Sequence, residues 1–217
     1  MEREIIERVT TERGELQLQR RGDTYEVISN GCFLMATYNG GSERAMVDLA
    51  ADWVKPRPPR RVLIGGLGVG YTLQAALSNP GVQQVTVVEI EQTVVDWNRR
   101  YLSEYNGGAL DDPRVELVIA DMAELLATPP KEPYDLILID TDNGPDWVVF
   151  ESNQTLWSAR GLDWVDRWRA PGGVLAFWSA QAAPDFESLL RRRYSEVRAS
   201  PVRAAVSPVD DVIYLAK

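Results

Sequence analysis

The sequence predicts an α/β fold with a mostly parallel sheet, preceded by a small antiparallel β unit. From residue 60 onward, short apolar strands alternate with segments whose apolar residues recur at helical spacing. This alternation is typical of βαβ units and of a parallel sheet covered on both faces. Before residue 42, apolar and polar residues alternate instead, and Asn30-Gly31 is a strong signal for a tight hairpin turn.

Changes in this pattern divide the chain into three parts. Residues 1–41 are expected to form the β-hairpin unit, in which TYEVIS and CFLMATY flank the turn. Residues 42–59 hold a helix, with Ser42 as a candidate N-cap, and the proline-rich break KPRPP. Residues 60–217 form the main domain, with strands expected at 62–65, 85–90, 115–119, 136–140, 174–178 and 212–215.

The composition is that of an ordinary globular protein, with 45% hydrophobic and 25% charged residues among 217. A net charge of −9 argues against nucleic acid as a partner, and no apolar run is long enough to favour a membrane. A charged N-terminus and a single cysteine, Cys32, indicate a cytoplasmic protein. We expect the Cys32 thiol to be buried. Histidine is absent, which excludes Ser–His and Cys–His nucleophile pairs, and the spacing of the carboxylates predicts no metal site.

The stretch VLIGGLGVGYT places four glycines directly after a strand. Gly66, Gly68 and Gly70 give the spacing GxGxG before a helix. In open α/β sheets, ligands bind beyond the carboxyl ends of the strands, and glycine lets them approach the backbone closely. The dinucleotide fingerprint GxGxxG would need glycine where Tyr71 stands, and no GK[ST] ending indicates a P-loop. The turn therefore predicts a nucleotide site but weakens an assignment to NAD or FAD.

Three carboxylates follow strands at the same predicted sheet edge. Glu89 ends VTVVEIE, where it could accept both ribose hydroxyls, and Asp121 follows VELVIA, where it could border an adenine. Asp140 ends YDLILID and would face the cleft. Each alone could be a helix cap or a solvated strand end. Together with the glycine turn, they favour a nucleotide site.

These segments resemble the spermidine synthase-like (polyamine aminopropyltransferase) branch of the class I S-adenosylmethionine-dependent methyltransferase fold. SNGCFLMAT and GSERAMVDLA resemble its strand unit and gateway helix, and RRVLIGGLGVG, VVEIE, IADMAE and LILIDTDNGP its nucleotide and catalytic segments. The resemblance implies a Rossmann-like, mostly parallel seven-stranded sheet with helices on both faces, and a homodimer that pairs through the N-terminal unit. It also implies that Glu89 holds ribose, that Asp121 and Met122 border adenine, and that Asp140 orients and deprotonates an attacking amine.

Two departures from the family concern its substrates. The family's glycine loop carries an aspartate for the donor's ammonium, where this chain has Val69. The gateway helix of the family carries a Tyr-Gln pair, where this chain has Met46-Val47. Because valine cannot pair with an ammonium, the sequence leans toward methyl transfer from S-adenosylmethionine onto a small acceptor, with a cationic amine as one option. Aminopropyl transfer from decarboxylated S-adenosylmethionine and noncatalytic nucleotide binding are the alternatives.

Three further residues are candidates for the acceptor side. Asp142 would be a second charge in the catalytic loop, or would only build the turn before Gly144. Trp147 follows that loop and could hold a cationic group by cation–π attraction. Glu43 stands at the start of the gateway helix, where it would line the acceptor pocket or simply favour the helix N-terminus.

Overall fold

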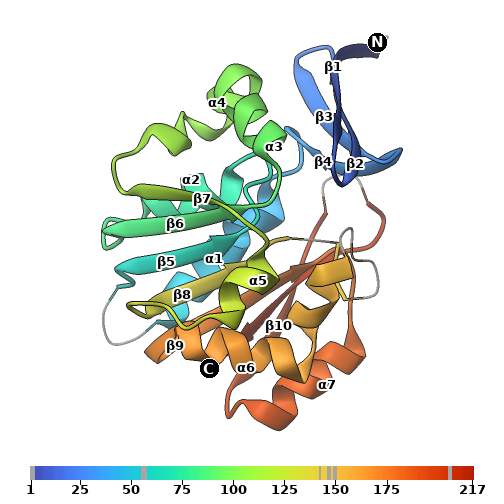
Figure 1. Ribbon diagram of the computed structural model, residues 1–217. Coiled ribbons are helices and arrows are strands. Elements are labelled where there is room, and N and C mark those ends of the chain that lie inside the picture. Colours follow the sequence, from blue (N-terminus) through green and yellow to red (C-terminus); the bar gives the residue numbers. More distant parts are fainter. Residues whose placement is uncertain (1–2, 55–57, 142, 146–147, 149–150, 205–206) are drawn as a thin grey trace.

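The computed structural model describes residues 3–54, 58–141, 143–145, 148, 151–204 and 207–217, and it contains two sheets (Figure 1). The N-terminal sheet has four antiparallel strands in chain order: β1 (Glu4–Thr11), β2 (Gly14–Arg21), β3 (Thr24–Ser29) and β4 (Cys32–Ala36). The predicted hairpin turn is confirmed, with φ of 50° at Asn30 and 80° at Gly31. The expectation of a buried Cys32 is wrong, because this residue begins an edge strand and is exposed.

The main sheet has seven strands, as expected. They are β5 (Arg61–Gly65), β6 (Gln84–Glu89), β7 (Val115–Ile119), β8 (Tyr134–Ile139), β9 (Arg169–Ser179), β10 (Val197–Val202) and β11 (Asp211–Ala216). Their order is β10-β11-β9-β8-β5-β6-β7. Neighbours from β9 to β7 are parallel, whereas β11 runs antiparallel to both β9 and β10. The first residue of β11 therefore lies at the edge where the parallel strands end.

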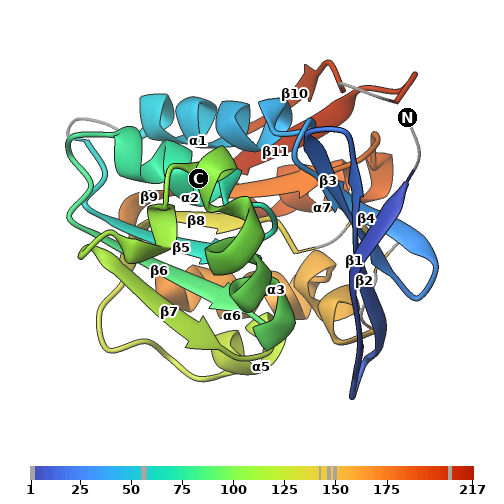
Figure 2. The same cartoon turned by 90° about the horizontal axis from the view of Figure 1, so that it is seen from above.

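Helices cover both faces of this sheet (Figures 1 and 2). One hydrophobic core joins the sheet to α1 (Gly41–Trp53), α2 (Tyr71–Ser78) and α3 (Gln92–Trp97), and the other joins it to α5 (Met122–Ala127), α6 (Ala159–Trp168) and α7 (Pro184–Arg193). Shorter helical segments are the π-helical η1 (Asn98–Leu102), α4 (Ser103–Asn106), η2 (Ala109–Asp111) and η3 (Glu151–Trp157). Among the described residues, no helix is long and apolar enough to cross a membrane.

The start of α1 differs from the expectation. Ser42 lies inside the helix, whose N-cap residue is Gly40, and no described side chain caps this end. The Ser42 hydroxyl instead accepts a hydrogen bond from Trp178 Nε1 of β9 at 2.9 Å. The hydroxyl is thus turned toward the sheet, and not toward the free N–H groups of the helix.

The N-terminal sheet stands across the edge where the parallel strands end (Figure 2). Glu7 of β1 holds it there through the helical segment that follows β6. Trp97 Nε1, the Tyr101 hydroxyl and Arg100 Nη1 each donate to the Glu7 carboxylate at 2.7 Å. These bonds, led by the one from Tyr101, lower the pKa of Glu7. The sheet is therefore fixed where its inner face can form one wall of a cleft.

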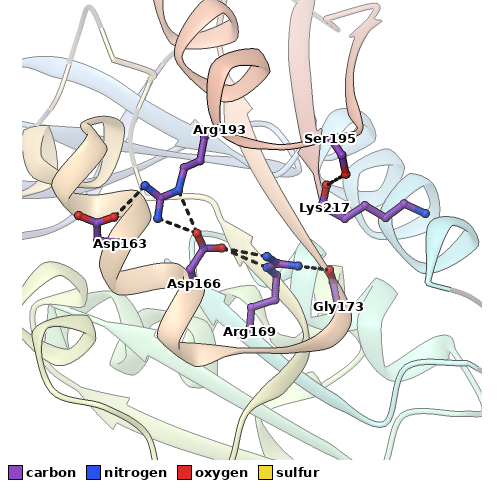
Figure 3. Close-up of polar contacts among 7 residues, drawn as sticks. All are labelled: Asp163, Asp166, Arg169, Gly173, Arg193, Ser195 and Lys217. Carbon is purple, nitrogen blue, oxygen red and sulfur yellow. Dashed lines mark hydrogen bonds and ion pairs between the residues drawn. The ribbon is translucent and has the colours of Figure 1, made fainter.

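An ion network joins the C-terminal half of α6, the start of β9 and the end of α7 (Figure 3). Asp166 accepts from Arg169 Nε and Nη2 at 3.2 and 3.1 Å, and from Arg193 Nε and Nη2 at 2.9 and 2.8 Å. Arg193 Nη1 also lies 2.7 Å from Asp163 Oδ1. Because Asp166 serves two arginines from different elements, it links the helices on this face of the sheet.

Candidate active site

A cleft opens where β5, β6 and β8 end, and its empty space, open solvent included, measures about 1090 Å³. Apolar side chains of the N-terminal sheet, Leu16, Leu34 and Met35, form one wall. The loops after the parallel strands form the opposite side. Six of the predicted site residues line this cleft: Glu43, Gly66, Gly68, Glu89, Met122 and Asp140.

The glycine turn adopts the backbone that only glycine takes without strain. Gly66, Gly68 and Gly70 have φ of 91°, 54° and 93°. A Cβ on Gly66 would lie 2.1 Å from the backbone oxygen of Asp140, so this glycine lets the turn pass close to β8. Gly70 is the N-cap residue of α2, and a Cβ there would meet Asn106 Nδ2 at 2.8 Å. Gly66 and Gly68 thus border the cleft, and Gly70 serves packing.

Two asparagines hold the turn from its outer side. Asn98 Nδ2 donates to the Gly68 oxygen at 2.7 Å, and Asn106 Nδ2 donates to the Val69 oxygen at 2.8 Å. The two side chains are also bonded to each other at 2.8 Å. Both asparagines are buried. Their amides fix the turn's carbonyl groups on the far side from the cleft.

Glu89 is 7% exposed at the bottom of the cleft. Its Oε2 accepts from the Leu67 N–H at 3.0 Å, and its Oε1 accepts from the Glu91 N–H at 2.8 Å. Burial raises the pKa of Glu89, and the backbone hydrogen bonds oppose this effect. Each carboxylate oxygen can accept a further hydrogen bond. The carboxylate is thus oriented by the backbone and can still receive two hydroxyl groups.

Asp121 serves as the N-cap of α5. Its Oδ1 accepts from the Ala123 and Glu124 N–H groups at 2.7 and 3.2 Å. The neighbours of Asp121, Ala120 and Met122, line the cleft. The loop after β7 therefore contributes Ala120 and Met122 to the cleft, while the Asp121 side chain fixes the start of the helix.

Asp140 follows β8 and is partly buried at the cleft. Its Oδ2 accepts from the Thr72 hydroxyl at 2.7 Å. Burial raises the pKa of Asp140 to about 6, and the charge of Asp211 adds to the effect. The next side chain, Thr141, has a buried hydroxyl without a hydrogen-bond partner among the described residues. Asp142 and Trp147, also expected here, lie outside the described residues.

Glu43 reaches the cleft from the first turn of α1. Burial, together with the charge of Asp140, raises its pKa to about 8. The Ser42 hydroxyl lies 3.0 Å from Glu43 Oε2. Met46 and Val47 are fully buried in the core, so the two positions that depart from the family's Tyr-Gln pair support packing. Glu43 is therefore the ionisable group that α1 contributes to the cleft.

Sequence reasoning missed Asp211. It is 4% exposed, and burial raises its pKa. Asp211 begins β11, the antiparallel strand, whereas the predicted site carboxylates stand at the carboxyl ends of strands. Because β11 runs in the opposite direction, its start lies beside the end of β9, the strand that pairs with β8. Among the described residues, no group of three or more His, Cys, Asp or Glu side chains is arranged to hold a metal ion.

Comparisons with known proteins point to one family. A model of the spermine/spermidine synthase domain matches residues 43–176, more than half of the chain. The polyamine aminopropyltransferase of Sodalis glossinidius is 42% identical over 96 residues, which is 43% of this chain and 33% of that protein. Putrescine N-methyltransferase 2 of Nicotiana attenuata is 38% identical over 95 residues, 43% of this chain and 25% of that protein. The chain thus matches a third or less of the length of these relatives.

Solved structures agree on the fold. A spermidine synthase in complex with the transition-state analogue AdoDATO superposes with a TM-score of 0.83 at 21% identity, over 98% of this chain and 73% of that one. Spermidine synthase from Thermotoga maritima gives a TM-score of 0.79 at 19% identity, over 98% and 71%. The lean toward methyl transfer is not supported by these findings, which fit the aminopropyl alternative better.

Proposed function

Because the chain belongs to the spermine/spermidine synthase domain family, we propose that it is a transferase that moves an aminopropyl group from decarboxylated S-adenosylmethionine to an amine. The observation that carries this function is the placement of Glu89 and Asp140 in one cleft, on either side of the glycine turn. Glu89 would receive the ribose hydroxyls of the donor. Asp140 would meet the acceptor nitrogen.

The chemistry needs little from the protein beyond alignment and one proton acceptor. The nitrogen lone pair attacks the carbon bound to the sulfonium, the C–S bond breaks, and its electrons return to sulfur, which leaves as a neutral thioether nucleoside. A protonated amine cannot attack, so the nitrogen's proton passes to Asp140. The raised pKa of Asp140, about 6, suits a base that works near neutral pH. The Thr72 hydrogen bond orients the carboxylate for this step.

Methyl transfer is the second candidate, favoured by one observation. Val69 lines the cleft and is 5% exposed, so at this position of the turn the donor would meet a methyl group and not a carboxylate. A donor whose tail is an ammonium gains no ion pair from this side chain. The third candidate function is binding of the nucleoside without transfer of any group.

Calorimetric titration combined with turnover separates these candidates. Decarboxylated S-adenosylmethionine, S-adenosylmethionine and methylthioadenosine are titrated into the protein, and transfer to 1,4-diaminobutane is followed by mass spectrometry. Aminopropyl transfer predicts tightest binding of the decarboxylated donor and a product 57 Da heavier than the diamine, about the mass of the group added less one hydrogen. A methylated product would establish the second candidate function, and binding without product would establish the third.

The homodimer that pairs through the N-terminal sheet stays a prediction.

A further inference from the structure

Asp211 is a buried carboxylate whose charge acts on Glu43 and Asp140, and it has no charged partner among the described residues. Asp211 Oδ2 has no hydrogen-bond partner among the described residues, although the residue is only 4% exposed. No described Lys or Arg forms an ion pair with Asp211, Glu43 or Asp140. Burying a charge costs free energy unless the charge is paired. Such a cluster is neutralised by bound protons or by a cation that enters the cleft.

The sheet register directs Asp211 toward this cluster. Side chains of alternate residues share a face of a strand, so Asp211 lies on the same face as Ile213. Ile213 pairs with Trp178 of β9 and belongs to the core that packs against α1. Trp178 in turn donates to the Ser42 hydroxyl. Asp211 is thus on the face that α1 covers, next to the first turn of that helix.

Ser42 connects Asp211 with Glu43. The hydroxyl accepts the Trp178 N–H and lies 3.0 Å from Glu43 Oε2, and Asp211 is within hydrogen-bonding reach of the same hydroxyl. A hydroxyl has one proton to donate. It cannot serve both carboxylates at once. When Ser42 donates to Asp211, Glu43 Oε2 is free to accept an N–H from a molecule in the cleft.

We propose that Asp211 is a specificity-determining residue for the acceptor, which acts through Ser42 and through its own negative charge to make this end of the cleft bind an ammonium group. Glu43 and Asp140 contact the acceptor, and Asp211 stands behind them as a positioning residue. This role rests on the transfer function proposed above. The Thr141 hydroxyl, which has no hydrogen-bond partner among the described residues, also lines the cleft and offers the acceptor one further polar contact.

The test compares Asp211→Asn with Asp210→Asn. Asp210 is the adjacent residue, its side chain is 46% exposed, and it pairs with Arg203 at 3.3 Å, so the control removes the same charge one position away. The affinity for 1,4-diaminobutane is measured by calorimetry with methylthioadenosine at saturation, and KM and kcat are measured by turnover. We expect Asp211→Asn to weaken diamine binding and raise KM tenfold or more, with kcat within threefold and methylthioadenosine affinity within twofold. Asp210→Asn should change none of these beyond twofold.

Thermal unfolding distinguishes this role from a structural one. A site residue held against like charges destabilises the fold, so Asp211→Asn should raise the melting temperature. A variant that is less stable than the wild type, or that fails to fold, would show that Asp211 is structural and overturn the proposal. The proposal would also be overturned if diamine binding were unchanged in Asp211→Asn, or if the wild type did not bind the diamine. If the wild type binds the diamine with this dependence on Asp211 but forms no product, the transfer function fails and the role of Asp211 stands.

Discussion

Glu43 and Asp140 are 97 positions apart in the sequence, yet they line one cleft, and the charge of Asp140 helps raise the pKa of Glu43 to about 8. The two carboxyl groups come from the first turn of α1 and the end of β8. In the absence of a cation, burial and mutual repulsion favour proton uptake by the pair. An ammonium group would replace those protons.

The raised pKa of Glu43 makes stability depend on pH. A carboxyl group whose folded pKa exceeds its unfolded pKa of 4.5 contributes stability that is complete below that value and is lost as pH rises through the folded pKa. The wild type should therefore lose stability between pH 5 and pH 9. Glu43→Gln removes this pH-dependent contribution. At pH 9 we expect the variant to be more stable than the wild type by roughly 1–3 kcal/mol, measured by urea unfolding. Glu12→Gln, the same change at an exposed residue, is the control. An equal loss of stability between pH 5 and pH 9 in Glu43→Gln and in the wild type would contradict the raised pKa of Glu43.

Glu89→Gln should weaken adenosyl ligands. The variant keeps the shape of the side chain but loses the charge that would receive two ribose hydroxyls, a loss of roughly 1.5–3 kcal/mol, or about 10–150-fold in affinity. Methylthioadenosine titration measures it. Glu116→Gln, on the exposed side of the neighbouring strand β7, should bind as the wild type does. Full affinity in a folded Glu89→Gln protein would rule out the ribose role.

Val69→Asp should restore an ion pair for a cationic donor tail. We expect the affinity ratio of decarboxylated S-adenosylmethionine to methylthioadenosine to rise about tenfold, since a charge-assisted hydrogen bond is worth roughly 1.5–3 kcal/mol. Val69→Asn introduces a side chain of the same shape without the charge. If the aspartate and asparagine variants give the same ratio, the donor tail does not lie at this position of the turn.

Asp166→Asn should lower the free energy of unfolding by about 1 kcal/mol, because Asp166 is only 24% exposed and bonds two arginines. Asp163→Asn provides the comparison. Asp163 is 64% exposed, and Arg193 is its one ion-pair partner among the described residues, so its loss should cost less than about 0.5 kcal/mol. Chemical denaturation measures both. Equal effects of the two substitutions would mean that the network in Figure 3 does not link the helices as described.

The parts of the fold with local signals were predictable from the sequence. The glycine turn, the buried parallel strands and the hairpin at Asn30 each depend on residues close together in the chain. The edge strands β1 and β10 were missed, because EIIERVTT has three charged residues among eight and VRASPV contains a proline, and both strands are only partly buried. Such strands are defined by their neighbours more than by their own apolar pattern.

The candidate site was predictable where a residue ends a parallel strand, as Glu89 does, or directly follows one, as Asp140 does. Asp211 precedes its strand, so its place beside the cleft follows only from the antiparallel direction of β11. Ser42 was predicted to be an N-cap because its position at the start of the helix suits one. The partner that decides its orientation, Trp178, is 136 positions away. Pairings over such distances are set by topology, which no local pattern contains.

The most direct test of the central claim is the turnover of Asp140→Asn measured beside its affinity for methylthioadenosine. Asparagine keeps the shape of the side chain and can still accept the Thr72 hydrogen bond, but it cannot take a proton from an amine. We predict a fall in kcat of ~10²–10⁴ with nucleoside affinity within threefold of the wild type. Normal turnover by a variant with an intact nucleoside site would contradict the account, because Asp140 would then not be the group that receives the proton of the acceptor.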